Sequence, residues 1–225
     1  MKHGLQASEV LRELAPGQAV SGEALAARLG VTRAAVWKQV AALREVGLPI
    51  EARTGAGYRL PWPTQLLDAA RIQAEWGGTG SAPVQLYWEL DSTQDELARH
   101  LSAAPDLTVV LAERQTLGRG RRGRDWRSPP GLGICLSCLK RFSGSPAALS
   151  GLSIAVGVCV VQALTDVGVP GLQLKWPNDL WWQGRKLGGI LVETTSIGAE
   201  RYAVIGVGLN VQAPSSLPWP RSEER

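Results

Sequence analysis

Residues 109–139, VVLAERQTLGRGRRGRDWRSPPGLGICLSCL, contain two apolar segments on either side of a run in which glycine alternates with arginine. The segments 109–113 and 133–139 have the length and composition of buried strands. The run between them, residues 118–124, is a poor helix and a poor strand, because glycine loses more backbone entropy than any other residue when it is ordered. The stretch therefore predicts two strands of a sheet joined by a long basic loop.

The loop 118–124 has the residue types of an anion-binding segment. Its glycines let the backbone come close to a ligand, and the forked donors of arginine suit carboxylate and phosphate oxygens. Residues 114–127 hold six arginines and one acid, Asp125, so the empty loop repels itself and we expect it to be mobile until an anion binds. A solvated basic loop or a nucleic-acid-binding tail is the alternative interpretation, and the run lacks the Gly-Lys-Ser/Thr ending of a Walker A loop.

Around this loop, residues 64–213 alternate strand-like and helical patterns, which predicts a mixed sheet with helices packed against it. The expected helices are 66–76, 94–103 and 149–167. The expected strands are 84–90, 109–113, 133–139, 172–176, 179–182, 186–194 and 202–211.

Residues 1–63 follow a different plan, with three short helical patterns at 5–14, 22–29 and 33–46. Ser21 and Thr32 are suitable N-caps, and Gly30 suits the left-handed residue that ends a helix. Two helices joined by a three-residue turn indicate a helix-turn-helix, and the extended pair 50–53 and 58–60 indicates the wing of a winged helix. The predicted fold class is therefore α+β, with a winged helix-turn-helix before an α/β domain.

A winged helix places its third helix in the major groove, so DNA binding is the expected function of residues 1–63. These residues carry eight lysines and arginines against five acids. The candidate DNA-contacting residues are Ser21, Thr32, Arg33, Trp37, Lys38, Gln39, Arg44, Arg53 and Arg59. A helical module used for protein contacts or regulation is the alternative.

Composition excludes several classes of protein. Among the 225 residues, no apolar run reaches the roughly 18 that a membrane span needs. Three cysteines are too few for a disulfide framework, which favours a reducing, cytoplasmic compartment. Cys135 and Cys138 fall on opposite faces of a strand, so no metal site is expected there, and Cys159 is expected to be buried in helix 149–167.

Five motifs are spread through the larger domain. They are Asp91-Ser92-Thr93; Glu113-Arg114-Gln115 leading into Gly118–Arg124 and Trp126; Lys175-Trp176-Pro177-Asn178-Asp179-Leu180; Arg185-Lys186-Leu187-Gly188-Gly189-Ile190-Leu191-Val192-Glu193; and Gly206-Val207-Gly208-Leu209-Asn210. In combination these motifs closely resemble biotin–protein ligases. With the winged helix in front, the chain is similar, over nearly all of residues 8–211, to members of this family that also repress transcription in response to biotin.

The resemblance implies a catalytic domain over 64–213, similar to class II aminoacyl-tRNA synthetases, and a reaction in two steps. Biotin and ATP, with Mg²⁺, give biotinyl-AMP and pyrophosphate, and the biotinyl group then passes to a lysine of the biotin carboxyl carrier domain of a carboxylase. The resemblance also implies that biotinyl-AMP acts as a corepressor, favouring a homodimer that binds the operator DNA of biotin synthesis genes. No membrane is involved.

Attack of a carboxylate on the α-phosphate meets charge repulsion, so preorganised cations favour it, and no general base is needed because the carboxylate is already ionised. The implied catalytic residues are Arg119, Arg121 and Lys186. The implied biotin-binding residues are Ser92, Thr93, Gln94, Gln115, Arg119, Gly120, Arg121, Lys186, Gly188 and Gly189. The implied nucleotide-binding residues are Arg124, Trp126, Asn178 and Asn210, and Asp179 is implied to orient the acceptor lysine or a magnesium ion.

These residues also have ordinary structural interpretations. Ser92-Thr93 with Glu96 resembles a capping box, Asn178-Asp179 fits a turn, and Lys186 fits a solvated strand end. Trp126 fits plain packing.

Two features depart from the family pattern. Gln94 stands where asparagine is usual and is one methylene longer, so we expect a shifted polar contact in the biotin pocket. The family continues into a small C-terminal β-barrel, whereas this chain ends in a proline-rich, charged tail over 214–225. The alternative function is therefore a poorly active DNA-binding repressor that senses biotin or biotinyl-AMP.

Overall fold

The computed structural model describes residues 2–53, 55–76, 82–142, 149 and 151–212. Contacts between Cα atoms divide the chain into two compact units. The first contains the chain up to Leu67 together with Pro129–Leu132, and the second contains Asp68–Ser128 and Gly133–Val211. The tail predicted over 214–225 lies outside the described residues.

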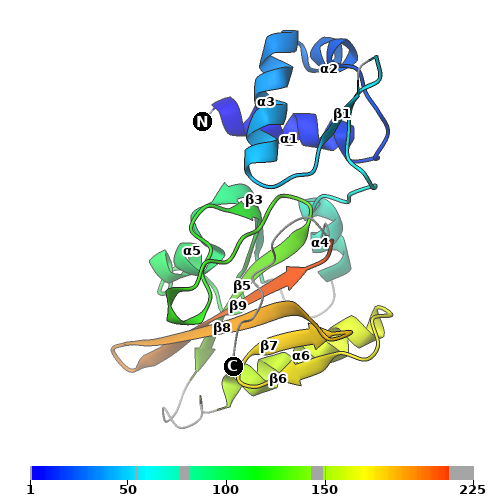
Figure 1. Cartoon of the computed structure of the whole chain (residues 1–225). Coiled ribbons are helices and arrows are strands. Elements are labelled where there is room, and N and C mark those ends of the chain that lie inside the picture. The colour runs from blue at the N-terminus through cyan, green and yellow to red at the C-terminus, as the bar shows by residue number, and fades with distance from the viewer. Residues whose placement is uncertain (1, 54, 77–81, 143–148, 150, 213–225) are drawn as a thin grey trace. The chain divides into compact units, whose positions relative to one another are not determined.

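The first unit is a winged helix, as the sequence predicts. Its helices are α1 (Lys2–Leu14), α2 (Gly22–Leu29) and α3 (Arg33–Glu45), and its wing is β1 (Glu51–Arg53) with β2 (Gly57–Arg59), as Figure 1 shows. Ser21 Oγ accepts a hydrogen bond from Ala24 N–H and Thr32 Oγ1 accepts one from Ala35 N–H, which confirms both predicted N-caps. The buried side chains of the three helices include Leu11, Leu14, Leu25, Val36, Val40 and Leu43.

The wing is joined to the segment before α2 by backbone hydrogen bonds. Val20 and Tyr58 exchange two of them, each 2.9 Å between nitrogen and oxygen. Gly57 makes this approach possible, because a Cβ atom added there would lie 2.1 Å from the Val20 oxygen, and its φ is +93°. Only glycine adopts this conformation without strain.

The second unit is built on one seven-stranded mixed sheet in the order β3-β4-β5-β9-β8-β7-β6. The strands are β3 (Val84–Leu90), β4 (Val109–Gln115), β5 (Gly133–Phe142), β6 (Gln173–Lys175), β7 (Asp179–Trp182), β8 (Arg185–Ile197) and β9 (Glu200–Asn210). Only the pair β3–β4 is parallel, and the other neighbours are antiparallel. A mixed sheet is therefore confirmed.

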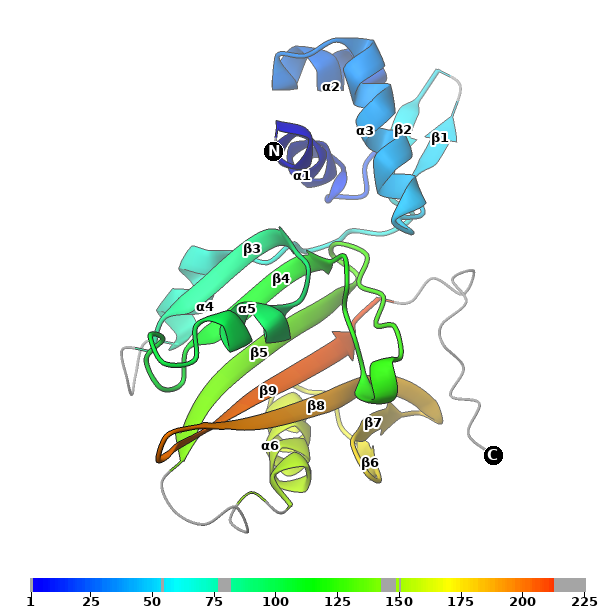
Figure 2. The same ribbon diagram turned by 90° about the vertical axis from the view of Figure 1, so that its left-hand side faces the viewer.

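The two faces of the sheet have different roles. Figure 2 shows α5 (Thr93–Arg99) in front of the sheet and α6 (Leu152–Asp166) behind it, with α4 (Ala69–Trp76) beside β3. Leu97 of α5 packs with Tyr202 and Val204, whereas α6 packs against Ile190 and Val207 on the other face. Because side chains alternate along a strand, even-numbered residues of β9 face α5 and odd-numbered ones face α6.

Most predicted elements are confirmed, and the differences lie mainly at their ends. Helices predicted over 66–76 and 94–103 are shorter in the structure, since α4 begins at Ala69 and α5 ends at Arg99. The expectation that Cys159 is buried is wrong, because it is exposed on α6, outside the stripe of Val156, Val160 and Leu164 that packs on the sheet. No described helix has both the length and the apolar composition to cross a membrane.

We expect Gly57→Ala to destabilise the winged helix more than Gly55→Ala. Both positions have positive φ, which costs about 1–2 kcal/mol for alanine, but nothing lies within 4 Å of a Cβ atom at Gly55. Hydrogen exchange of the α3 amides would measure both effects. Equal protection in the two variants would contradict the close approach of Val20.

Candidate active site

One pocket of about 270 Å³ lies on the α5 face of the second unit. Its floor comes from β5, β8 and β9, and its sides come from the start of α5, the loop after β4 and the residues around β7. The lining residues that the sequence analysis names are Ser92, Thr93, Gln94, Gln115, Arg119, Gly120, Arg121, Arg124, Trp126, Asn178, Asp179, Lys186 and Gly189. Segments far apart in the sequence therefore meet in one cavity.

Ser92 is the N-cap of α5 and is 1% exposed. Its Oγ accepts hydrogen bonds from the amides of Gln94 and Asp95, at 3.2 and 3.4 Å, so the predicted capping role is confirmed. The reciprocal bond of a capping box differs from the expectation, because Asp91 Oδ1, in place of Glu96, accepts from the Ser92 amide at 2.7 Å. The cap fixes the start of α5 at the edge of the pocket.

A chain of buried hydrogen bonds crosses the floor. Gln115 Oε1 accepts from the Thr93 amide at 2.7 Å, and the hydroxyls of Thr93 and Ser137 lie 2.8 Å apart. Ser137 Oγ then donates to Gln94 Oε1 at 3.0 Å. Thr93, Gln94 and Ser137 are each at most 3% exposed, so these bonds satisfy polar groups that would otherwise be costly to bury.

Gln94 uses its extra length to reach β9. Its Nε2 donates to the Val204 carbonyl at 2.8 Å, so the side chain spans from Ser137 on β5 to β9. Gly206 leaves the space for it, because a Cβ atom there would lie 2.8 Å from Gln94 Oε1. Gly208 leaves space in the same way for Trp126, whose ring carbons lie 2.6 Å from such a position.

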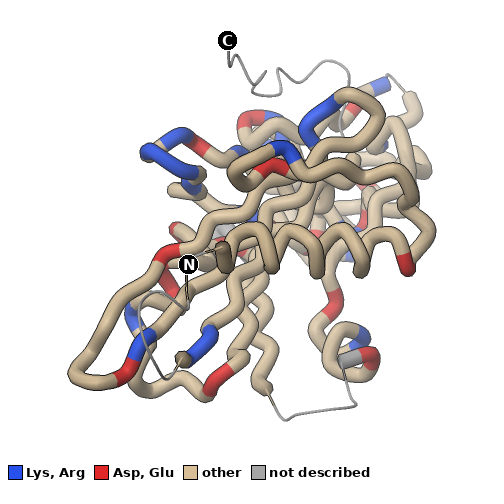
Figure 3. Tube along the Cα trace, turned by 90° about the horizontal axis from the view of Figure 1, so that it is seen from below, with Lys and Arg blue, Asp and Glu red and all other residues tan. Residues whose placement is uncertain are grey.

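The loop 118–124 is folded as a small hairpin. Trp126 N–H donates to the Gly118 carbonyl at 2.8 Å and Gly120 N–H donates to the Arg124 carbonyl at 2.7 Å. Arg122 at its tip has a φ of +58°, a conformation uncommon for residues with a side chain. Figure 3 shows the described lysines and arginines as blue segments and the described acids as red ones.

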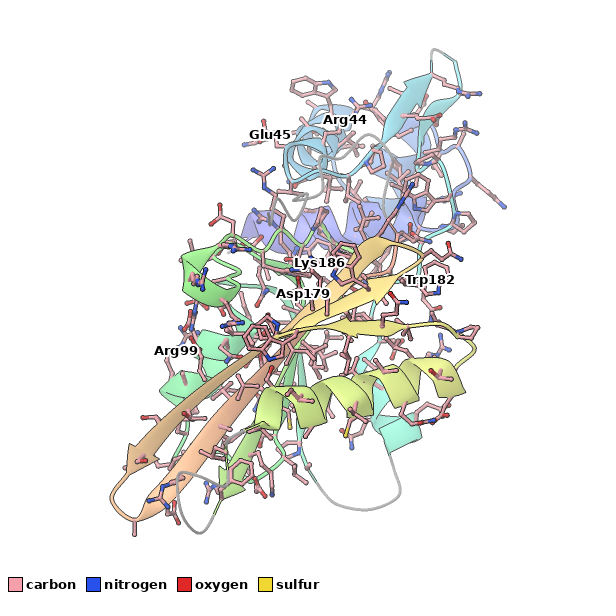
Figure 4. The ribbon with its side chains drawn as sticks, turned by 60° about the horizontal axis from the view of Figure 1, so that its bottom comes forward. Arg44, Glu45, Arg99, Asp179, Trp182 and Lys186 are labelled. Atoms are coloured by element: carbon pink, nitrogen blue, oxygen red, sulfur yellow. The ribbon has the colours of Figure 1, made fainter. Side chains whose placement is uncertain are left out.

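Three cations of the pocket differ in their partners, which are two carboxylates, one carboxylate and a neutral amide. Arg119 binds two carboxylates, with Nη1 2.5 Å from Asp95 Oδ2 and Nη2 2.8 Å from Glu193 Oε2, and these bonds, that to Asp95 above all, raise its pKa. Lys186 Nζ lies 2.7 Å from Asp179 Oδ1, and Figure 4 shows both side chains. Arg121 Nη1 instead donates to the neutral Asn178 Oδ1 at 3.3 Å.

Asn178 is anchored to β8 by both its side chain and its backbone. Its Nδ2 donates to the Ile190 carbonyl at 2.6 Å, and its carbonyl accepts from the Ile190 amide at 2.9 Å. Asn178 therefore has a structural role in addition to lining the pocket.

Two predicted site residues are not among those that line this pocket. Gly188 lies on the α6 face of β8, where a Cβ atom would meet the Gly208 oxygen at 2.4 Å and Leu209 at 2.8 Å, so its lack of a side chain serves strand packing. Asn210 Nδ2 donates to the Lys186 carbonyl at 3.5 Å. Their roles in ligand binding remain predictions.

Several lining residues were not predicted as site residues from the sequence. They are Asp125, Cys135, Leu136, Ser137, Ile190, Leu191, Gly206, Val207 and Gly208. Ser137 could have been predicted from the sequence, because it is a polar residue within the apolar segment 133–139. The strand residues become visible only once β5, β8 and β9 are paired.

The candidate DNA-contacting residues mostly lie on the surface of the winged helix. Trp37 is 63% exposed, and Ser21, Thr32, Arg33, Lys38, Arg44 and Arg53 are exposed as well. The expectation that Gln39 points outward is wrong: it is 5% exposed, because it shares the inner face of α3 with Val36, Val40 and Leu43. On the wing, Arg59 is half-buried and pairs with Glu51 at 2.8 Å, while Arg44 Nε donates to the Ile50 carbonyl.

The structure therefore joins a winged helix to a mixed α/β domain whose pocket is lined by uncharged polar groups and by the cations Arg119, Arg121, Arg124 and Lys186. The chain belongs to the biotin/lipoate A/B protein ligase family, whose model matches residues 88–210. A model described as an HTH domain matches residues 7–59.

Curated relatives include the bifunctional ligase/repressor BirA of Salmonella typhimurium, 42% identical over 88% of this chain, and that of Escherichia coli, 40% identical over 94% of it. The chain spans only 61% and 65% of the lengths of these two relatives. Among solved structures, biotin acetyl coenzyme A carboxylase synthetase of Helicobacter pylori superposes with a TM-score of 0.50 and 24% identity over 60% of this chain and 64% of that one, a likeness of fold.

Asp91 provides a pH test of the segment that begins the pocket. Hydrogen bonds from Arg99, and then from the Ser92 amide, lower the pKa of Asp91 to about 2. A carboxylate whose pKa is lowered by folding stabilises the fold at pH values above its pKa in the unfolded chain, about 3.9. This stabilisation is lost as the pH falls toward the pKa of the folded state. We expect Arg99→Gln to raise the pKa of Asp91 in an NMR titration, whereas Arg28→Gln, which breaks a pair with Glu13, leaves it unchanged. An unchanged titration in Arg99→Gln would refute the pairing.

Proposed function

We propose that this chain is a biotin–protein ligase that also binds DNA. It activates biotin with ATP to biotinyl-AMP and transfers the biotinyl group to a lysine of a carboxylase carrier domain. The observation that carries the proposal is the order of groups in the pocket: uncharged hydrogen-bonding groups at the floor and arginine and lysine at the sides.

The floor suits a cyclic urea, the head group of biotin. Ser92 Oγ already accepts two amide hydrogens, so its hydroxyl hydrogen is available to a ligand carbonyl. Gln115 directs its oxygen at Thr93, which leaves its amide group as a donor. The hydroxyl oxygens of Thr93 and Ser137 can accept from ligand N–H groups. A urea offers one acceptor and two donors, so it can satisfy both sets.

The sides suit the first chemical step. An oxygen of the biotin carboxylate forms a bond to the α-phosphorus of ATP, and the bond from that phosphorus to the bridging oxygen of pyrophosphate breaks. Negative charge gathers on the phosphoryl oxygens, and we assign Arg121 and Lys186 to stabilise it, because both cations line the pocket. The ionised carboxylate is the nucleophile, so no side chain has to remove a proton.

The magnesium ion of this reaction arrives with ATP as part of the substrate. Asp179 is the carboxylate of the pocket nearest to Lys186, at 2.7 Å, and could orient either the ion or the acceptor lysine after Lys186 turns to the phosphate. In the second step the neutral acceptor amine attacks the biotinyl carbonyl carbon, AMP leaves with the bonding electrons, and the nitrogen loses one proton to water to give the amide.

The winged helix extends the proposal to biotin-responsive repression. Biotinyl-AMP acts as the corepressor, and a homodimer binds operator DNA through α3 and the wing. The relatives named as bifunctional ligase and repressor support this pairing of functions. The alternative is a repressor that binds biotin or biotinyl-AMP but turns over poorly.

We expect Arg121→Gly and Lys186→Ala each to reduce biotin-dependent ATP–pyrophosphate exchange by about 10²-fold or more, because each removes a cation aimed at the developing charge. The thermal unfolding midpoint should change little, since both side chains lie at the pocket and outside the core. The matched control is Arg122→Gly, a loop arginine that is not among the lining residues and whose φ of +58° suits glycine.

Equal exchange in Arg121→Gly and Arg122→Gly would contradict the assignment of Arg121. Transfer to a purified carrier domain is measured in parallel. Normal exchange without transfer in the unmodified protein would favour the biotin-sensing repressor.

For DNA binding, we measure the slope of log binding constant against log salt concentration for a mixed-sequence duplex. We expect Arg33→Ala to reduce the magnitude of this slope by about one, because one phosphate contact is lost. Trp37→Ala should weaken binding without changing the slope, since it removes no charge. Filter binding over a range of salt concentrations measures both. Equal slopes in the unmodified protein and Arg33→Ala would count against a phosphate contact, and pyrophosphate exchange should be unaffected in both variants.

A further inference from the structure

We propose that Asp95 and Glu193 are positioning residues that hold the loop 118–124 over the pocket by binding Arg119. Arg119 then acts as the anchor of the loop, and Arg121 meets the substrate anion. The part of this proposal that concerns catalysis rests on the proposed function, whereas the part that concerns loop position does not.

The three side chains come from three separate elements. Asp95 lies in the first turn of α5, Glu193 lies on β8, and Arg119 lies on the loop between them. The guanidinium uses one nitrogen for each carboxylate, at 2.5 and 2.8 Å. The loop is therefore tied to both α5 and β8 through a single side chain.

The charges argue for an anchor. Two carboxylates next to a site for a polyanion would oppose binding unless they had another task. Arg119 faces both of them, so the three groups together carry one net negative charge, and Arg119 offers little attraction to a further anion. Arg121, which faces the neutral Asn178, keeps its charge for the ligand.

The anchor can act on Arg121 because the hairpin is short. The backbones of Arg119 and Asp125 form a β-bridge across it, and the Gly120 amide donates to the Arg124 carbonyl. Fixing Arg119 therefore fixes the strand that leads directly into Arg121. Only Gly120 lies between Arg119 and Arg121, so a fixed Arg119 limits how far the Arg121 backbone can move from the pocket.

The alternative role for Arg119, direct contact with the substrate anion, predicts the opposite response. If Arg119 binds the anion, removing both carboxylates releases its charge and lowers the repulsion, so affinity rises. If Arg119 is an anchor, removing them frees the loop, so affinity falls.

The first test needs no substrate. Trypsin cleaves after arginine but needs a locally unfolded backbone, so release of the loop makes the bonds after Arg121, Arg122 and Arg124, which are already exposed, easier to cleave. We expect Asp95→Asn with Glu193→Gln to increase cleavage within 118–124 by at least threefold, as identified by mass spectrometry, with an unchanged unfolding midpoint. The matched control is Glu13→Gln, which breaks a pair of 2.7 Å with Arg28 in the winged helix. An unchanged cleavage rate would overturn the anchor. If the double variant fails to fold, Glu193→Gln alone serves, because Glu193 is exposed.

The second test measures biotin affinity by titration calorimetry and the KM for ATP in pyrophosphate exchange. We expect the dissociation constant for biotin and the KM for ATP each to rise about fivefold or more in the double variant. Adding Arg119→Gln to the double variant should raise neither constant above its value in Arg119→Gln alone. Tighter binding in the double variant would assign Arg119 to the anion and overturn the proposal. Faster cleavage in a chain whose unmodified form binds no biotin would keep the anchor and refute the proposed function.

Discussion

Repulsion among the arginines of one short loop is the constraint on which the pocket depends. Residues 114–127 hold six arginines and one acid. The loop cannot lie over a cavity unless carboxylates from other segments neutralise some of this positive charge. Asp95 and Glu193 neutralise the charge of Arg119. Glu89 on β3 does the same for Arg114 on β4. The preceding segment 64–113 supplies acids for this purpose, with eight against two bases.

The glycines of β9 complete the arrangement from the other side. Gly206 and Gly208 point to the α5 face, where the space left by their missing side chains is taken by Gln94 and Trp126. One strand therefore admits both an amide that organises the polar floor and an indole that closes the loop onto the sheet. This explains in packing terms why the segment 206–208 alternates glycine with valine, whose side chain faces the α6 core.

The helices and strands were predicted well because caps, glycine ends and apolar runs lie within each element. For example, α2, β3 and β7 begin and end at the predicted residues. Most of the pocket lining was predicted from the resemblance of its motifs. Two burial errors have one cause, since Gln39 and Cys159 lie on helices whose inner face is decided by tertiary packing. The partners of Arg119 were missed because they lie 24 and 74 residues away in the chain, and only the assembled sheet brings them together.

The exposure of the Arg119 pairs fits a loop that has to open. The side chains of Arg119, Asp95 and Glu193 are 30%, 36% and 44% exposed. Ion pairs with this much contact with water contribute about 0–1 kcal/mol each, so two of them hold a loop without preventing its release. A fully buried pair would leave uncompensated charges whenever it broke, at a cost of several kcal/mol, and would slow every entry of ligand. Under the proposed function, a partly exposed anchor would let the same loop exclude water during reaction and still open to admit and release substrates.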